Sequence, residues 1–251
     1  MNADLASVLE YLQAIGWEDV YLPRRAADRA AAVAPEPAPS RAPRMPSSAP
    51  AVTPAATPST GEPADARAEK LRVVASEAES CERCRLAGGR RTVVFGSGNP
   101  DADLMFIGEG PGAEEDKQGL PFVGPAGQLL TKIIGAIGLL REQVYIANVV
   151  KCRPPGNRDP QPDEVAACRA FLAEQVRLVQ PRVIVALGRI AGQTLLGNEL
   201  PVGRLRGSWH RVFDVPLRVT YHPAALLRNE ALKRPTWEDM QIVRDRLAVE
   251  P

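Results

Sequence analysis

From about Arg67 onward, short apolar segments alternate with stretches of helical periodicity, and this alternation constrains the possible fold more than any other feature. Such alternation is typical of a parallel sheet with helices on both faces. We therefore predict a three-layer α/β/α domain around a central, mainly parallel sheet of four strands. The expected strands are Leu104–Gly108, Val144–Val149, Val183–Leu187 and Leu217–Tyr221, and the expected helices are Ala126–Ile137, Asp163–Val179, Ile190–Leu196 and Trp237–Ala248.

Two of these helices carry start signals in the sequence. Pro162 is followed by the acidic residues Asp163 and Glu164, which favours a helix that begins there. Thr236 has Asp239 three residues later, a spacing that predicts an N-terminal cap at Thr236.

The chain before this domain has a different composition. Apolar residues recur at helical spacing from Leu5 to Ile15, which predicts a short amphipathic helix within residues 1–25. Residues 26–66 are rich in Ala and Pro, so we predict a disordered linker there and the α/β domain over residues 67–251. The apolar face of residues 1–22 favours docking on this domain or on another replication or repair protein, and our hypothesis is that it recruits such a partner; the alternative is a poorly ordered terminus.

Charge and hydropathy exclude some classes of protein. The 251 residues carry 31 Lys and Arg against 30 Asp and Glu, so any surface for an anionic partner must be a local patch. Residues 1–12 lack a basic start followed by an apolar run, and the sequence has no apolar stretch of membrane-spanning length. We expect no membrane association and a cytoplasmic location, where thiols stay reduced.

Four cysteines are spread over the predicted domain. Cys81 and Cys84 form a CxxC pair, and Cys152 and Cys168 follow after 67 and 15 intervening residues. Thiolates at such spacing hold an iron–sulfur cluster or a zinc ion, and the spacing alone does not decide between the two. The alternatives are disulfides and ordinary buried thiols, as Cys168 on an apolar helix face would be. The buried-thiol alternative is weaker for Cys152, which lies in a Pro- and Gly-rich loop.

Polar residues follow three of the predicted strands at their carboxyl ends. Glu109 follows the first strand, Asn148 closes the second, and His222 follows the fourth. Each alone is compatible with a turn, but the carboxyl ends of parallel strands share one edge of the sheet, where α/β proteins bind ligands. The glycines around Glu109 match neither a phosphate-binding loop nor a dinucleotide fingerprint.

These residues lie in segments that together resemble the family 4 uracil-DNA glycosylases. GEGPGAEED at residues 108–116 resembles the first motif of that family, and GLPFVG at 119–124 resembles the second. NVVKCRPPGNR at 148–158 is similar to the third motif and HPAALLR at 222–228 to the last. The resemblance covers about residues 67–248. It implies a monofunctional enzyme that flips uracil out of single- or double-stranded DNA and hydrolyses its N-glycosidic bond, which initiates base excision repair.

The resemblance also implies roles for individual residues. Glu109 and His222 would be catalytic. Glu109 would orient the attacking water, stabilise the cation-like sugar, or both, and His222 would donate a hydrogen bond to uracil O2. Phe122 would stack on the flipped base, Asn148 would read its edge, and Gly110 and Asn157 would line the site. Leu226 or Leu227 would fill the gap in the duplex, although burial in the following helix is the alternative for both. Basic residues near these motifs would contact phosphates: Lys151, Arg153, Arg158, Arg228, Lys233 and Arg234.

The cofactor and the quaternary state follow from the same resemblance. In this family four cysteines hold a structural 4Fe-4S cluster, which here would be bound by Cys81, Cys84, Cys152 and Cys168. A related subgroup that traps uracil covalently has a basic insertion after the third motif, and residues 157–162 leave no room for it. The resemblance therefore implies turnover, and we expect a monomer.

Overall fold

The computed structural model describes residues 62–249, so the predicted helix in residues 1–25 and most of the predicted linker lie outside the described residues. The strands are β1 (Ser97–Gly98), β2 (Leu104–Gly108), β3 (Tyr145–Asn148), β4 (Val183–Leu187), β5 (Trp209–Val212) and β6 (Val215–Thr220). The helices are α2 (Ala64–Glu79), α3 (Ala113–Gln118), α4 (Pro125–Ala136), α5 (Pro162–Val179), α6 (Gly188–Leu196), α7 (Val202–Leu205), α8 (Pro223–Arg228) and α9 (Lys233–Ala248). Among these described residues, every helix is too short or too polar to cross a bilayer.

The strands form one mixed sheet in the order β1-β3-β2-β4-β6-β5. The four predicted strands are confirmed as its parallel centre, β3-β2-β4-β6. The predicted strand number is wrong, because β1 and β5 add antiparallel edges. Strand β1 has two residues, too few for a sequence pattern, and β5 joins β6 through Phe213 and Asp214, both at positive φ, as in a tight hairpin turn.

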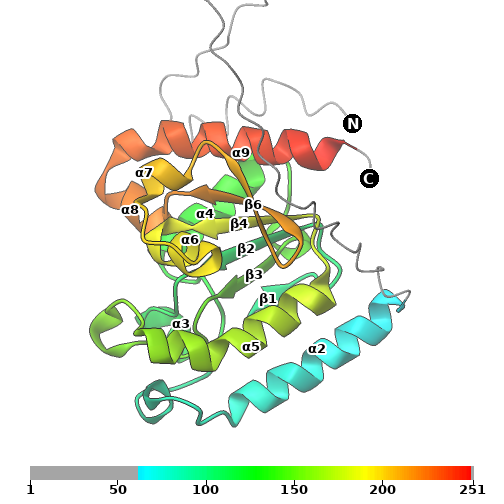
Figure 1. Ribbon diagram of the computed structural model, residues 1–251, viewed down its shortest axis with the longest axis vertical. Coiled ribbons are helices and arrows are strands. Elements are labelled where there is room, and N and C mark those ends of the chain that lie inside the picture. Colours follow the sequence, from blue (N-terminus) through cyan, green and yellow to red (C-terminus); the bar gives the residue numbers. More distant parts are fainter. Residues whose placement is uncertain (1–61, 250–251) are drawn as a thin grey trace, which may run out of the picture. The chain divides into compact units, whose positions relative to one another are not determined.

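Helices cover both faces of the sheet (Figure 1). Met105 and Ile107 of β2 point to the face packed by α2, α5 and α6, whereas Leu104 and Phe106 point to the face packed by α4, α8 and α9. Because successive side chains of a strand alternate between faces, the apolar run of β2 is buried on both sides. The three-layer prediction is confirmed.

Helix α2 has no counterpart among the predicted elements. It begins at Ala64, so the last residues of the predicted linker are helical, and it lies along α5 on the outer side of one helical layer (Figure 1). Leu71 and Ala78 pack into the core, and the buried Arg67 donates to the carbonyl oxygen of Leu178 at 2.7 Å. The few apolar residues of α2 give too weak a helical periodicity to predict the helix from the sequence. The contacts that stabilise it come from α5 and are visible only in the folded structure.

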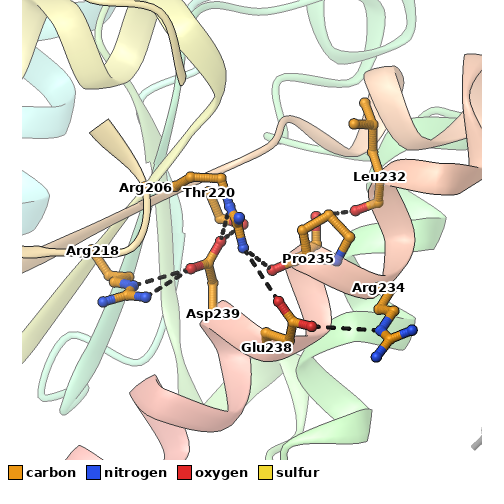
Figure 2. A network of polar contacts seen from close by, with 9 residues as sticks. Arg206, Arg218, Thr220, Leu232, Arg234, Pro235, Glu238 and Asp239 are labelled. Atoms are coloured by element: carbon orange, nitrogen blue, oxygen red, sulfur yellow. Dashed lines mark hydrogen bonds and ion pairs between the residues drawn. The ribbon is translucent and has the colours of Figure 1, made fainter. Parts of the chain in front are cut away.

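The start of α9 differs from the prediction. The helix begins at Lys233, and Thr236 lies inside it, with its hydroxyl donating to the carbonyl oxygen of Leu232 at 2.8 Å. Asp239 is fully buried and makes no cap. It accepts hydrogen bonds from Arg218 and Thr220 of β6 and from Arg206 after α7, which tie α9 to both elements (Figure 2). The prediction for α5 is confirmed, with Pro162 as its first residue.

Candidate active site

Glu109 and Asn148 lie at the carboxyl edge of the sheet, Glu109 directly after β2 and Asn148 at the end of the neighbouring strand β3. Gly108 and Asn148 are partners in register, and Asn148 is 1% exposed. Its side-chain oxygen Oδ1 is buried and has no hydrogen-bond partner within the described part of the chain. A buried acceptor without a partner costs stability, so it marks a place where a ligand donor fits.

Gly108 permits the close packing at this point. A Cβ atom there would lie 2.4 Å from Asn148 Oδ1 and 2.6 Å from Phe122 Cζ. The Asn148 amide and the Phe122 ring therefore both approach the backbone of β2. Only a residue without a side chain leaves room for both groups.

Phe122 is held in an uncommon backbone conformation. Its φ is 53°, in the left-handed region that bulky residues avoid, and its ring is buried. Glu115 fixes the segment that follows, since one of its carboxylate oxygens accepts from the amides of Val123 at 2.9 Å and Gly124 at 3.1 Å. Arg141 holds the other side by donating to the carbonyl oxygen of Pro121 at 2.6 Å. Strain of this kind persists only where the surroundings impose it, and it is common in binding sites.

His222 caps helix α8 and faces Phe122. Its Nδ1 accepts from the amide of Ala224 at 3.1 Å, which fixes the neutral tautomer with the proton on Nε2. Burial, together with the charge of Arg228, lowers the pKa of His222 to about 4. The ring centroids of Phe122 and His222 are 5.5 Å apart. Gly188 admits this ring, since a Cβ atom there would lie 2.8 Å from the Cβ of His222.

Glu109 is a carboxyl group with a shifted pKa. Burial is the largest cause, the charge of Asp159 adds to it, and the charge of Arg189 opposes it, so the pKa of Glu109 rises to about 7. Asp159 and Arg189 form an ion pair. Carboxyl groups with a pKa near neutrality are common among catalytic acids and bases.

The other predicted site residues lie in different settings. Gly110 follows Glu109, and a Cβ atom there would lie 2.8 Å from Val150 Cγ2. Asn157 is exposed in a turn, and its side-chain oxygen accepts from Arg153 Nε at 2.8 Å. Leu226 is 1% exposed and belongs to the core, whereas Leu227 is 53% exposed.

The four cysteines line one cavity at the end of the α2–α5 pair. Cys81 and Cys84 follow α2, Cys152 lies in the loop after β3, and Cys168 is on α5. Arg90 Nη1 donates to Cys152 Sγ at 3.4 Å, and the backbone amide of Lys151 donates to Cys168 Sγ at 3.3 Å. Across the described residues, no three His, Cys, Asp or Glu side chains converge on a point that would suit a single metal ion.

One predicted phosphate contact, Lys151, is wrong. This residue is 1% exposed and lies inside the protein, where burial lowers its pKa to about 7. Arg158 is partly exposed and forms two hydrogen bonds with the buried carboxylate of Glu164, at 2.8 and 2.6 Å.

Sequence reasoning also missed Glu115 and Gly108 as individual site residues. Both lie in the first motif together with Glu109, and this shared motif was the signal in the sequence that could have identified them as site residues.

This sheet has polar groups at three of its strand ends and a thiol-lined cavity beside it. Residues 95–241 match the family described as "Uracil DNA glycosylase superfamily", so the chain is a member of that superfamily. A type-4 uracil-DNA glycosylase of Saccharolobus solfataricus is 41% identical over 192 residues, which cover 73% of this chain and 89% of that protein. The type-4 enzyme of Thermotoga maritima is 45% identical over 181 residues, 70% and 93% of the two chains. The chain belongs to the type-4 uracil-DNA glycosylases, as its motifs predicted.

A more distant relative is similar over a smaller part of the chain. A type-5 uracil-DNA glycosylase of Pyrobaculum aerophilum is 32% identical over 149 residues, 53% of this chain and 66% of that protein.

Proposed function

We propose that this chain removes uracil from DNA by hydrolysing the bond between uracil N1 and the deoxyribose C1′ carbon, the first step of base excision repair. The observation that carries the proposal is the buried Asn148 amide, whose oxygen has no partner among the described residues and which packs beside Phe122. Uracil offers an N3–H donor next to the O4 acceptor, the complement of this amide. Cytosine presents the reverse pattern, so a fixed amide discriminates between the two bases.

Phe122 and Asn148 bind the flipped base. The Phe122 ring stacks on the planar uracil, and Asn148 accepts from N3–H and donates to O4. Because Glu115 and Arg141 hold the Phe122 segment, the ring is already oriented before the base arrives. Such preorganisation reduces the free-energy cost of ordering the site when substrate binds.

His222 stabilises the leaving group. As the N1–C1′ bond breaks, its electron pair departs with uracil, and negative charge develops on O2. The neutral tautomer carries its proton on Nε2 and donates it as a hydrogen bond to that oxygen. A pKa of about 4 keeps this tautomer intact at neutral pH.

Glu109 acts on the sugar side. The deoxyribose becomes cation-like as the bond breaks, and a carboxylate nearby stabilises that charge. The carboxylate also orients the attacking water and takes its proton as the oxygen bonds to C1′, while the uracil anion is protonated from solvent. A pKa of about 7 suits this exchange, because the group releases and accepts a proton near neutral pH.

Leu227 fits the gap that the flipped nucleotide leaves in the duplex. It is 53% exposed on α8, five residues after His222, whereas Leu226 is buried in the core. Arg228, exposed at the end of the same helix, is suited to a nearby phosphate. Asn157 and Arg153 form an exposed polar pair in the loop that carries Cys152, and we assign this pair to the rim of the site.

We further propose that Cys81, Cys84, Cys152 and Cys168 hold a 4Fe-4S cluster. Four thiols brought together around one cavity match the four-cysteine ligand set that such a cluster uses. The N–H groups that point at Cys152 and Cys168 are of the kind that stabilise cluster sulfurs. These cysteines belong to the segment after α2, the loop after β3 and helix α5, so a cluster held by them would join the three segments and have a structural role.

We also propose that the protein acts as a monomer in the cytoplasm. All groups of the proposed site belong to one chain, and cluster thiolates require a compartment in which thiols stay reduced. Size-exclusion chromatography with light scattering tests the first part, and fractionation of producing cells tests the second.

Excision is tested with oligonucleotides that contain one uracil, single-stranded or paired with A or G. Alkali cleaves the abasic product, so a shorter strand reports activity. Strand cleavage at uracil but not at cytosine is the expected result, and an intact strand after prolonged incubation refutes the function. In Asn148→Asp, the carboxylate has no N–H for uracil O4, so the same assay should lose uracil excision. A variant that kept the wild-type rate would disprove base reading by Asn148.

A further inference from the structure

Lys151 is a fully buried basic residue between the candidate active site and the cysteine cavity. It is 1% exposed and follows β3 by three residues. A lysine at such a depth is uncommon, because removing an ammonium group from water costs free energy unless hydrogen bonds replace the lost hydration. The proposed chemistry gives this side chain no role.

The ammonium group bonds to two uncharged oxygens. Nζ donates to the backbone carbonyl oxygen of Asn148 at 2.8 Å and to the side-chain oxygen of Gln175 on α5. The ring of Phe95 lies 5.7 Å from Nζ. Gln175 is itself buried and anchored, because its amide nitrogen donates to the carbonyl oxygen of Phe95 at 2.8 Å and to the Tyr145 hydroxyl at 3.2 Å. Lys151 therefore connects the end of β3 to a fixed point on α5.

The backbone of the same segment is fixed on both sides. The amide of Val149 donates to the carbonyl oxygen of Gly108 at 2.9 Å, and the amide of Val150 donates to that of Glu109 at 3.2 Å. The next amide, that of Lys151, donates to Cys168 Sγ at 3.3 Å. The amides of Val149 and Val150 thus bond to the end of β2, and the amide of Lys151 bonds to a thiol of the cysteine cavity.

We propose that Lys151 is a positioning residue for uracil recognition, which holds the Asn148 peptide so that the Asn148 side chain meets the flipped base. The inference rests on the proposed function. Without the ammonium group, the buried carbonyl oxygen of Asn148 loses its donor, and the strand end relaxes to find another. The Asn148 side chain then moves with its backbone, because Gly108 and Phe122 leave it no other space.

Lys151→Met tests this role, because it keeps the length of the side chain and removes the donor. A displacement of about 1 Å in a site of this kind costs about 100-fold in rate, so we expect the single-turnover rate of uracil release to fall tenfold to a hundredfold, roughly. Affinity for a uracil-free oligonucleotide should stay unchanged, since Lys151 does not reach the surface. Lys70→Met, on the exposed side of α2, is the matched control and should excise at the wild-type rate.

A double-mutant cycle separates positioning from general damage. If Lys151 acts through Asn148, then Lys151→Met adds little further loss in an Asn148→Ala background. If it only supports the fold, the two losses multiply. Iron content and the melting curve are measured on every variant to establish that each is folded.

A second variant keeps the test decisive where Lys151→Met yields too little folded protein. Gln175→Leu removes the outer anchor of Lys151 and leaves Asn148 untouched, and it should give a smaller loss that also disappears in the Asn148→Ala background. Multiplicative losses, or a wild-type rate for the variant, overturn the role of Lys151. Failure of the wild-type enzyme to excise uracil would instead refute the proposed function.

Discussion

Gly108→Ala tests whether uracil excision requires the close packing of Asn148 and Phe122 against Gly108. The added Cβ atom would lie 2.4 Å from Asn148 Oδ1 and 2.6 Å from Phe122 Cζ, whereas ordinary contacts begin at 3.4 Å. The Asn148 amide must therefore retreat by about 1 Å, and misplacement on this scale costs about 100-fold in rate. The cost in stability is smaller, since overpacking typically costs about 1–3 kcal/mol.

The assay is single-turnover release of uracil from a single-stranded oligonucleotide, together with the melting temperature. We expect a rate loss of about 100-fold with the domain still folded at the assay temperature. Gly203→Ala is the matched control, because the nearest atom to its added Cβ would be the Tyr221 hydroxyl at 4.0 Å. If Gly108→Ala excised uracil at the wild-type rate, the packing argument and the placement of Asn148 would both be refuted.

Three further predictions concern the pH profile, the cysteines and the N-terminal part of the chain. Glu109 works as a carboxylate with a pKa of about 7, so the single-turnover rate should rise with pH through neutrality and fall on the acid side as the group is protonated. Asp159→Asn should move this acid limb to lower pH and Arg189→Gln to higher pH; shifts of the same sign in both would disprove the electrostatic account. The purified protein should be brown with about four irons per chain, and Cys84→Ser or Cys152→Ser should lower the folded yield. Stoichiometric zinc without iron after anaerobic purification would exclude the cluster. Deleting residues 1–61, which leaves α2 whole, should not change excision of oligonucleotides but should remove any co-purifying protein. A large loss of activity would show that this part of the chain serves the DNA site, and the recruitment hypothesis would be withdrawn.

The parallel centre of the fold was predictable because its strands are apolar on both faces. Val183–Leu187 and Leu104–Gly108 form uninterrupted apolar runs, and both strands have the predicted bounds. The edge strand Trp209–Val212 is half exposed and is defined by pairing with β6, so its own residues gave no comparable signal. Helix α2 was missed for a similar reason, since its stability depends on α5.

The candidate site was predictable where a residue follows a strand. Glu109, Asn148 and His222 follow or close predicted strands, and because the carboxyl ends of parallel strands share one edge of the sheet, their common location there could be expected. Lys151 was misjudged because a lysine in a loop is usually exposed, and its burial depends on Gln175 from a distant helix. Leu226 and Leu227 are adjacent and chemically equal, so only packing distinguishes the buried residue from the exposed one.

In the proposed reaction, groups at the carboxyl edge of the sheet stabilise charge as uracil leaves, and His222→Ala tests this role most directly. Loss of one such donor costs about 2.7–4 kcal/mol in comparable sites, which corresponds to about 100- to 1000-fold in rate. The measurement is the single-turnover rate of uracil release at saturating enzyme, with affinity for uracil-containing DNA measured in parallel. We expect a rate loss of that size with DNA affinity unchanged. An unchanged rate, or a loss that excess enzyme restores, would contradict it.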